Sequence, residues 1–164
     1  MNPILYLPIA PPAAGKSHTA QVMLDNNILK WDDIVEPDHY RAILTGSRKT
    51  QTANSEVFKL VDMVVEIRLR GGCDVYLDAT NLNTKFRNNM VGKLIRDIPD
   101  VRIIILTSDA SKELLDIRNE RRLHTVPQHV LDRMWEQSFD LDQQINFPHE
   151  IYLLIEAQQW KERP

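Results

Sequence analysis

A Gly-Lys-Ser triplet near the start of the chain has the residue types that bind phosphate groups. Gly15, Lys16 and Ser17 follow a short apolar run and precede a helical pattern. In the GxxxxGK(S/T) pattern, backbone N–H groups and a helix N-terminus surround the phosphates, the lysine reaches the β and γ phosphates, and the hydroxyl holds Mg²⁺. The position of the triplet between an expected strand and an expected helix predicts a phosphate loop.

The segment departs from the strict pattern at its first position. Ala10 replaces the first glycine, and we expect its methyl group to crowd a backbone that must curl tightly. An ordinary helix start is the alternative interpretation, because glycine and serine are common there. The surrounding strand and helix favour the phosphate site.

A carboxylate follows the second expected strand. Pro37 restricts the residue before it to extended geometry, so we expect Asp38 at a junction between strand and helix, on the edge of the sheet where ligands bind. Arg41 follows three residues later. Taken alone, these two residues are more simply explained as a helix cap and its surface ion-pair partner.

Polar residues also follow the third expected strand, namely Asp78, Thr80 and Asn81. An acid at this point can hold Mg²⁺ through its water shell. Turn and cap hydrogen bonds made by Asp78 and Asn83 are an equally good explanation.

Two arginines lie four residues apart on one face of an expected helix. Guanidinium groups bind phosphate oxygens through paired hydrogen bonds, so Arg118 and Arg122 could close over a transferring phosphoryl group. A solvated arginine face is the alternative.

The elements that must position these residues alternate along the chain. Short runs rich in β-branched and aromatic residues predict five strands, at Ile4–Ile9, Trp31–Val35, Asp74–Leu77, Val101–Leu106 and Ile151–Ile155. Apolar residues at three- and four-residue spacing predict helices after the phosphate loop and at Ser55–Arg70, Thr84–Asp97, Ser111–Arg122 and Pro127–Phe139. This alternation predicts an α/β fold with a parallel sheet covered on both faces and ligands at the carboxyl ends of its strands.

Length and composition limit the remaining choices. The 164 residues suit one domain, 1–164, and a formal charge of −3 argues against bulk adhesion to DNA or anionic lipid. The single cysteine, Cys73, has no disulfide or zinc-binding partner and is expected to be a small buried hydrophobe. The proline-broken apolar start fails as a signal peptide and is too short to span a membrane, so we expect a cytoplasmic protein with no membrane contact.

In order along the chain, these segments resemble the 5′-kinase domain of bacteriophage-type polynucleotide kinases and the wider set of small P-loop kinases. The matching pieces span nearly the whole chain: Pro12–Ser17, Asp38–Arg41, Leu77–Asn83, Arg118-Asn119 followed by Arg122, and Val126-Pro127. The resemblance implies a P-loop NTPase fold with a parallel five-stranded sheet, helices on both faces and a lid that carries arginines. It also implies ATP and Mg²⁺ as cofactors, and phosphoryl transfer to the 5′-hydroxyl of a DNA or RNA end.

The resemblance assigns roles residue by residue. Asp38 is expected to be the general base, and Arg41 is expected to contact the acceptor's neighbouring phosphate; Lys16 and Arg122 complete the catalytic set. The residues expected to bind the donor are Ala13, Ala14, Gly15, Lys16, Ser17, His18, Arg118 and Arg122. Those expected to bind the acceptor are Arg41, Thr80, Asn81, Arg87 and Val126.

Ser17 and Asp78 are the expected metal ligands. The bacteriophage enzymes have their D-T-N-L-N aspartate where Ala79 stands here, whereas many relatives have D-x-T-N, with the acid at Asp78. Family members often carry a phosphatase or ligase as well. Because only residues 156–164 follow the last expected strand, we expect any such module on a separate protein.

Other functions fit the same residues. A P-loop kinase could act on a nucleoside, a nucleotide or a sugar, although the phosphate-reading Arg41 beside Asp38 favours a phosphodiester substrate. Ala10 and the proline-rich loop would also suit a nucleotide-binding module without turnover, or a scaffold that binds no nucleotide. A short basic channel for a nucleic-acid end could include Arg41, Arg48, Lys49, Lys85 and Arg87. Homo-oligomerisation stays open.

Overall fold

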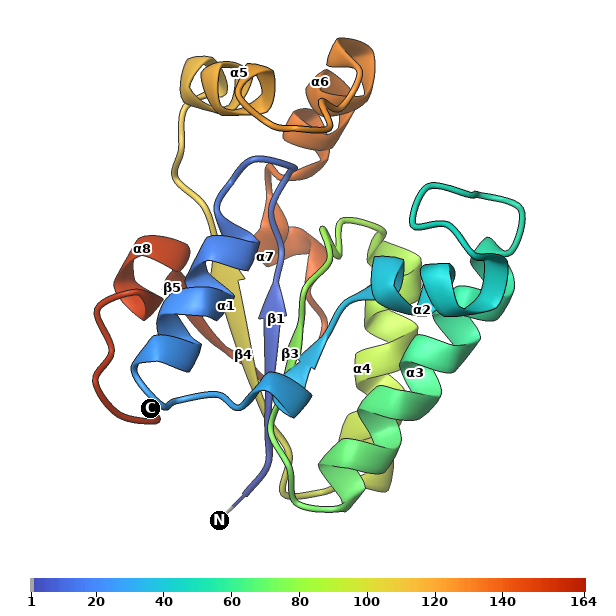
Figure 1. Ribbon diagram of the computed structural model, residues 1–164. Helices are drawn as coiled ribbons and strands as arrows, with labels where there is room; N and C mark the ends of the chain where they lie inside the picture. The colour runs from blue at the N-terminus through green and yellow to red at the C-terminus, as the bar shows by residue number, and fades with distance from the viewer. Residues whose placement is uncertain (1) are drawn as a thin grey trace.

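Five short strands form one parallel sheet in the computed structural model, which describes residues 2–164. The strands are β1 (Ile4–Pro8), β2 (Ile34–Val35), β3 (Val75–Leu77), β4 (Arg102–Thr107) and β5 (Glu150–Leu153). They lie in the order β2-β3-β1-β4-β5, and all neighbours are parallel (Figure 1). The expected parallel five-stranded sheet is confirmed.

Helices cover both faces of this sheet. Their bounds are α1 Lys16–Asp25, α2 Pro37–Thr45, α3 Asn54–Arg70, α4 Thr84–Asp97, α5 Lys112–Glu120, α6 Gln128–Gln137, α7 Leu141–Gln144 and α8 Leu154–Ala157. Figure 1 shows α3 and α4 on one side of the sheet and α1 and α8 on the other. The four long helices expected from the sequence are therefore present within a few residues of their expected bounds.

Alternation along β1 explains why both faces are covered. Leu5 and Leu7 pack in one buried cluster with the apolar residues of α3 and α4, whereas Ile4 and Tyr6 pack in a second cluster with α1 and α8. Successive side chains of a strand point to opposite faces, and here both sets are fully buried. The sheet can face apolar layers on both sides because its central strands β1 and β3 have no charged residue and are buried at every position.

Two of the expected strands are partly replaced by helical turns in the structure. Trp31–Asp33 forms a 3₁₀ turn, and only Ile34 and Val35 pair with β3. The last strand ends at Leu153, after which the chain forms α8 instead of continuing to Ile155. In both cases the expected strand is divided between a shorter strand and a helical turn, which a pattern over so few residues does not distinguish.

The expectation for Cys73 was wrong, because its side chain is exposed. It lies after the turn at Gly71-Gly72, where Gly72 takes a positive φ of 76°. The residue therefore precedes the buried part of β3 rather than belonging to it.

Beyond the carboxyl ends of the strands, α5 and α6 form a separate layer (Figure 1). We call these two helices and their connection, residues 111–137, the lid. The lid stands above the loop between β1 and α1. Among residues 2–164, no helix combines the length and apolar content needed to cross a bilayer.

Candidate active site

The β1–α1 loop has the backbone geometry of an anion site. Ala13 and Gly15 take positive φ angles of 65° and 101°, and Gly15 is the N-cap of α1 without any side-chain cap. Within the described chain, the N–H groups of residues 13–18 donate to no protein acceptor. Clustered free N–H groups at a helix N-terminus attract phosphate, so the loop offers a ready set of donors.

The expected crowding at Ala10 does not occur. Ala10 has an ordinary negative φ, is fully buried and donates its N–H to the Thr80 carbonyl at 3.2 Å. The left-handed backbone lies instead at Ala13 and Gly15. A glycine is therefore not required at position 10, and the methyl group there packs in the core with Ala14.

Lys16 lies over the loop that precedes it. Its Nζ donates to the carbonyls of Pro11 at 2.7 Å and Ala10 at 3.2 Å, which leaves one of its three donors for a ligand. Burial lowers the pKa of the Lys16 amine to about 8; the nearby Asp78 carboxylate opposes this effect and Arg122 adds to it. A bound phosphate would favour the charged amine.

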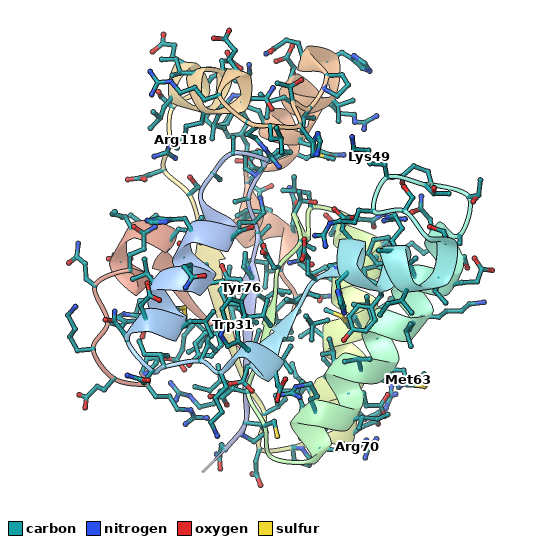
Figure 2. The ribbon with its side chains drawn as sticks, viewed as in Figure 1. Trp31, Lys49, Met63, Arg70, Tyr76 and Arg118 are labelled. Atoms are coloured by element: carbon teal, nitrogen blue, oxygen red, sulfur yellow. The ribbon has the colours of Figure 1, made fainter. Side chains whose placement is uncertain are left out.

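Tyr76 supports the loop from beneath. This buried β3 residue, labelled in Figure 2, donates its hydroxyl to the Lys16 carbonyl at 2.7 Å. The bond fixes the first turn of α1 against the sheet. No sequence pattern indicated this role, because Tyr76 resembles any other core residue of a strand.

Two cavities meet at the phosphate loop. The first, of about 640 Å³, lies between the loop and the segments that follow β4 and β5, with Ser108, Asp109, Leu154 and Gln158 among its lining. The second, of about 660 Å³, lies between the loop, α2, the β3–α4 loop and the lid. Both are lined by Ala13, Gly15, His18 and Arg118. A ligand whose phosphates lie on the loop can reach both.

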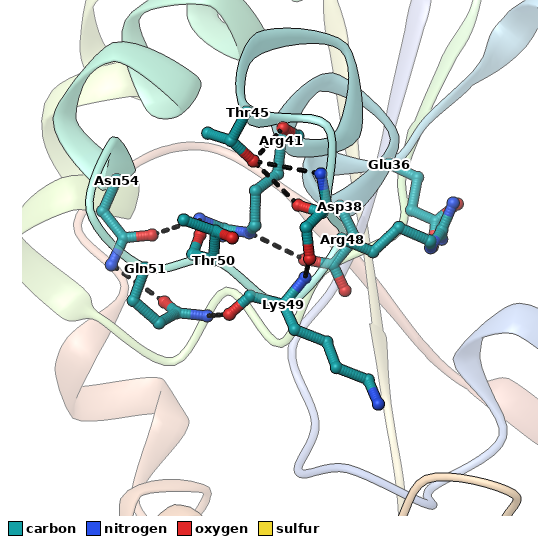
Figure 3. Close-up of polar contacts among 10 residues, drawn as sticks. Glu36, Asp38, Arg41, Thr45, Arg48, Lys49, Thr50, Gln51 and Asn54 are labelled. Carbon is teal, nitrogen blue, oxygen red and sulfur yellow. Dashed lines mark hydrogen bonds and ion pairs between the residues drawn. The ribbon is translucent and has the colours of Figure 1, made fainter.

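The second cavity contains the Asp38–Arg41 pair. Asp38 lies in the first turn of α2, its side chain is 54% exposed, and its Oδ1 accepts from Arg41 Nε at 3.2 Å. Arg41 is buried, and its Nη1 donates to the Thr50 carbonyl at 3.3 Å and to Asn54 Oδ1 (Figure 3). Among residues 2–164, its Nη2 makes no hydrogen bond. One Asp38 oxygen and one arginine nitrogen therefore remain free.

Glu36 also lines this cavity, although the sequence did not single it out as functional. Its carboxylate accepts from Arg48 (Figure 3). Burial raises the pKa of Glu36, and the Arg48 guanidinium opposes that shift. Its position just before Pro37, at the carboxyl end of β2, was the available signal. The apolar lining residues Phe58 and Met134 carried no such signal, because they fit a helix core equally well.

Ser17 and Asp78 lie in the same cavity as the phosphate loop. A hydroxyl and a carboxylate are hard oxygen ligands of the kind that Mg²⁺ prefers. Among residues 2–164, no cluster of three or more acidic, histidine or cysteine side chains could hold a metal alone. The donor set therefore fits Mg²⁺ that is bound together with substrate phosphates.

The lid presents arginines that lack acidic partners. Arg118 Nη1 approaches the Ala13 carbonyl at 3.4 Å, and both Arg118 and Arg122 line the second cavity. Figure 2 shows Arg118 on the lid, close to the phosphate loop. Among residues 2–164, the arginines without a carboxylate within 4 Å are Arg87, Arg118, Arg121, Arg122 and Arg133. Four of these five arginines therefore belong to the lid and one to α4, and Arg118 and Arg122 are the two that line the second cavity.

Asn119, between the two lid arginines, fixes the connection to α6. Its buried amide donates to the Val126 carbonyl at 2.8 Å, and its Oδ1 accepts from the Val126 N–H at 2.9 Å. Val126 lines the second cavity. Asn119 therefore holds Val126 at the cavity, a role that the sequence analysis missed because the partner is backbone.

The predicted acceptor residues separate into two groups. Arg41, Thr80 and Val126 line the second cavity. Asn81 instead bonds the carbonyls of Pro8, Leu77 and Ala79, and it lines none of the cavities described. It fixes the loop that carries Thr80.

Direct substrate contact by Arg87 was a wrong prediction. Its side chain is only 1% exposed, and Nη1 donates to the Asn81 carbonyl at 2.7 Å. Helical periodicity places Arg87 on the core face of α4, with Met90 and Val91. The charge therefore lies beneath the β3–α4 loop, not on its surface.

The model of the AAA domain family designated AAA_33 matches residues 7–141. No curated protein matches this chain in sequence. Among solved structures, a chain of the Pnkp1/Rnl/Hen1 RNA repair complex is similar with a TM-score of 0.69 and 22% identity, over 88% of this chain and 47% of that one. This protein therefore spans about half the length of that chain.

Two small kinases are similar over nearly their whole length. The APS kinase CysC of Mycobacterium tuberculosis, solved with AMPPNP and APS, has a TM-score of 0.58 and 13% identity, covering 96% of this chain and 94% of that one. A gluconokinase from Sinorhizobium meliloti 1021 has a TM-score of 0.56 and 17% identity, covering 96% and 87%. Since the family model matches residues 7–141 and the fold is shared with these kinases, this protein belongs to the AAA domain family and has the fold of P-loop kinases.

Proposed function

We propose that this protein is a kinase that transfers the γ-phosphoryl group of ATP to the 5′-hydroxyl of a polynucleotide. The observation that carries the proposal is the second cavity, in which Asp38 and Arg41 share one space with Lys16 and the lid arginines. Phosphoryl transfer needs mainly positioning and charge neutralisation around an in-line γ-phosphate. A base, a phosphate loop and free guanidinium groups around one cavity supply both.

The donor would lie across the phosphate loop. The free N–H groups of residues 13–18 and the Lys16 amine would hold its phosphates, and the first cavity would receive its base. Ser17 and Asp78 would hold Mg²⁺, which when bound neutralises charge on the β and γ phosphates. Arg118 and Arg122 would contact the phosphates from the lid.

Asp38 would act as the general base. Arg41 holds one carboxylate oxygen, which leaves the other to accept the proton of the acceptor hydroxyl. The hydroxyl oxygen forms a bond to the γ-phosphorus as the bond to the bridging oxygen breaks, and ADP leaves. Lys16 and Arg122 stabilise the charge that develops on the transferred group.

The polynucleotide acceptor is favoured by the free Nη2 of Arg41. A phosphate-binding group beside the base suits an acceptor hydroxyl that is followed by a phosphodiester. A small-molecule kinase is the second candidate, because APS kinase and gluconokinase share this fold.

Transfer of labelled γ-phosphate tests the proposal. The acceptors are a 5′-hydroxyl oligonucleotide, a nucleoside 3′-phosphate, free nucleosides and gluconate, each with MgATP. We expect labelling of the oligonucleotide end, and a loss of about 10²–10⁴ in kcat with Asp38→Asn. The exposed Asp32→Asn change is the matched control, since Asp32 lies outside both cavities. Labelling of a small molecule alone would replace the proposal by the second candidate.

A further inference from the structure

A third cavity continues from the second one. It has a volume of about 560 Å³ and lies between the start of α4, α6 and α7. Thr80 and Met134 line both the second and the third cavity. A chain molecule whose end lies beside Asp38 could therefore extend into the third cavity without leaving the protein surface.

The lining of the third cavity suits a polar anion. It contains Thr84, Gln137, Gln144 and the exposed Arg133, and it contains no carboxylate. The other two cavities differ in this respect, because Asp109 lines the first and Glu36, Asp38 and Asp78 line the second. Within residues 2–164, Arg133 has neither a carboxylate within 4 Å nor a side-chain hydrogen bond, so its guanidinium is free for a ligand.

Arg87 adds a second positive charge, buried directly behind Thr84 in the lining of the third cavity. Its Nη2 lies 3.5 Å from Thr84 Oγ1, its buried Nε has no partner, and no carboxylate of residues 2–164 lies within 4 Å. Thr84 in turn donates to Gln144 Oε1 at 2.9 Å, which fixes the wall between α4 and α7. An uncompensated buried cation raises the electrostatic potential of the adjoining space.

We propose that the third cavity binds the phosphodiester-linked continuation of the acceptor strand, with Arg133 contacting its second phosphate. The inference rests on the proposed function and deepens it, because it assigns a place for nucleotides beyond the one that is phosphorylated. A nucleoside 3′-phosphate would fill the second cavity only, whereas a longer strand fills both. The protein therefore prefers oligonucleotides over mononucleotides.

Kinetics with acceptors of one to six nucleotides test the inference at fixed MgATP. With the wild-type protein, KM is expected to fall as the acceptor grows from one nucleotide to three, and then to stay constant. Arg133→Gln is expected to raise KM for a hexanucleotide about tenfold, with KM for a nucleoside 3′-phosphate and for ATP unchanged. It should also reduce the salt dependence of oligonucleotide binding, since one phosphate contact is lost.

Two further variants separate this effect from a general loss of charge. Gln137→Glu places a carboxylate in the third cavity and is expected to raise KM for the hexanucleotide. Arg121→Gln removes an unpaired lid arginine outside all three cavities and is expected to leave KM unchanged. If the wild type labels the hexanucleotide but Arg133→Gln leaves its KM unchanged, the third cavity is not the acceptor path. If the wild type labels no oligonucleotide, the proposed function itself fails.

Discussion

The phosphate loop and the lid both offer groups for phosphate, but they hold them in different ways. The loop uses backbone N–H groups and is embedded in the core through buried Ala10, Pro11 and Ala14. The lid uses arginine side chains on two largely exposed helices, whose buried residues are Leu115, Asn119 and Leu131. Few buried contacts imply low local stability, so the loop should stay rigid while the lid opens.

Many of the contacts between α5 and α6 are polar contacts between side chains, not packing of buried apolar residues. Lys112 links Asp116 of α5 to Asp132 of α6, and Gln128 bonds the same two carboxylates. Exposed ion pairs contribute little to stability. Under the proposed function, donor binding would depend on the main fold, whereas closure of the lid over the reacting groups would depend on a weakly held layer.

The largest effect is expected from Leu131→Ala, which removes the fully buried α6 anchor. Such truncations cost about 2–5 kcal/mol, enough to open the lid without unfolding the sheet. Hydrogen exchange should show loss of protection over residues 112–137 and none over β1 and β4. Leu123→Ala is the control, because Leu123 is 92% exposed. Uniform loss of protection across the sheet would mean that lid and sheet unfold together.

Lys16→Met tests the loop. Removing the amine should lower phosphoryl transfer by about 10²–10³, the usual cost of losing one preorganised group that stabilises transition-state charge. The melting temperature should hardly change, because the lysine bonds only loop carbonyls. Activity assays and thermal unfolding measure the two effects. A large drop in melting temperature would assign Lys16 a structural role instead.

Asn119→Asp tests how the lid positions Val126. The substitution keeps the acceptor for the Val126 N–H but leaves the Val126 carbonyl without its donor. Losing a buried hydrogen bond costs about 1–3 kcal/mol. We expect a higher KM for the acceptor and little change in the dissociation constant for ATP. Equal changes in both would show that Asn119 supports the lid as a whole.

The Lys16 pKa predicts how donor binding depends on pH. Because burial lowers this pKa to about 8 in the free protein, the amine loses its charge above pH 8 unless phosphate is bound. Affinity for ATP should therefore fall above pH 8, by at most about tenfold per pH unit. Titration calorimetry between pH 7 and 9.5 measures this slope, and Lys16→Met should remove it.

The same pKa has an opposite consequence for stability. Between pH 8 and the usual lysine value, the unfolded chain binds more protons at this position than the folded chain does. The Lys16 contribution to the free energy of unfolding should therefore rise with pH in that window. Denaturant unfolding of wild type and Lys16→Met at pH 7.5 and 9.5 compares the two.

The smallest effect is expected from Lys112→Met, which breaks an ion pair within α5, to Asp116, and another between α5 and α6, to Asp132. Both pairs are partly exposed to solvent, so the melting temperature and the lid's hydrogen-exchange protection should barely change. Any loss should vanish in 1 M salt. A loss comparable to that of Leu131→Ala would show that polar contacts, not apolar packing, hold the lid closed.

The order of elements was predictable because strands and helices have different apolar periods. Buried runs predicted all five strands in part, and the spacing of Val57, Val61 and Val65 predicted α3 within one residue of its start. Strand was wrongly predicted for short segments that form helical turns, at Trp31–Asp33 and after Leu153. Over three or four residues, apolar content does not distinguish a strand from a helical turn.

The α/β fold and the candidate residues of the phosphate loop could be predicted from the sequence, because both depend on local order along the chain. Which candidate residues share a cavity follows only from the way the chain packs. In the folded protein, Asp38, Lys16 and Val126 line the same cavity. Arg87 lies beneath the β3–α4 loop, where it donates to the Asn81 carbonyl. These outcomes depend on which elements pack together and which face of a helix is buried, and such contacts join residues far apart in sequence.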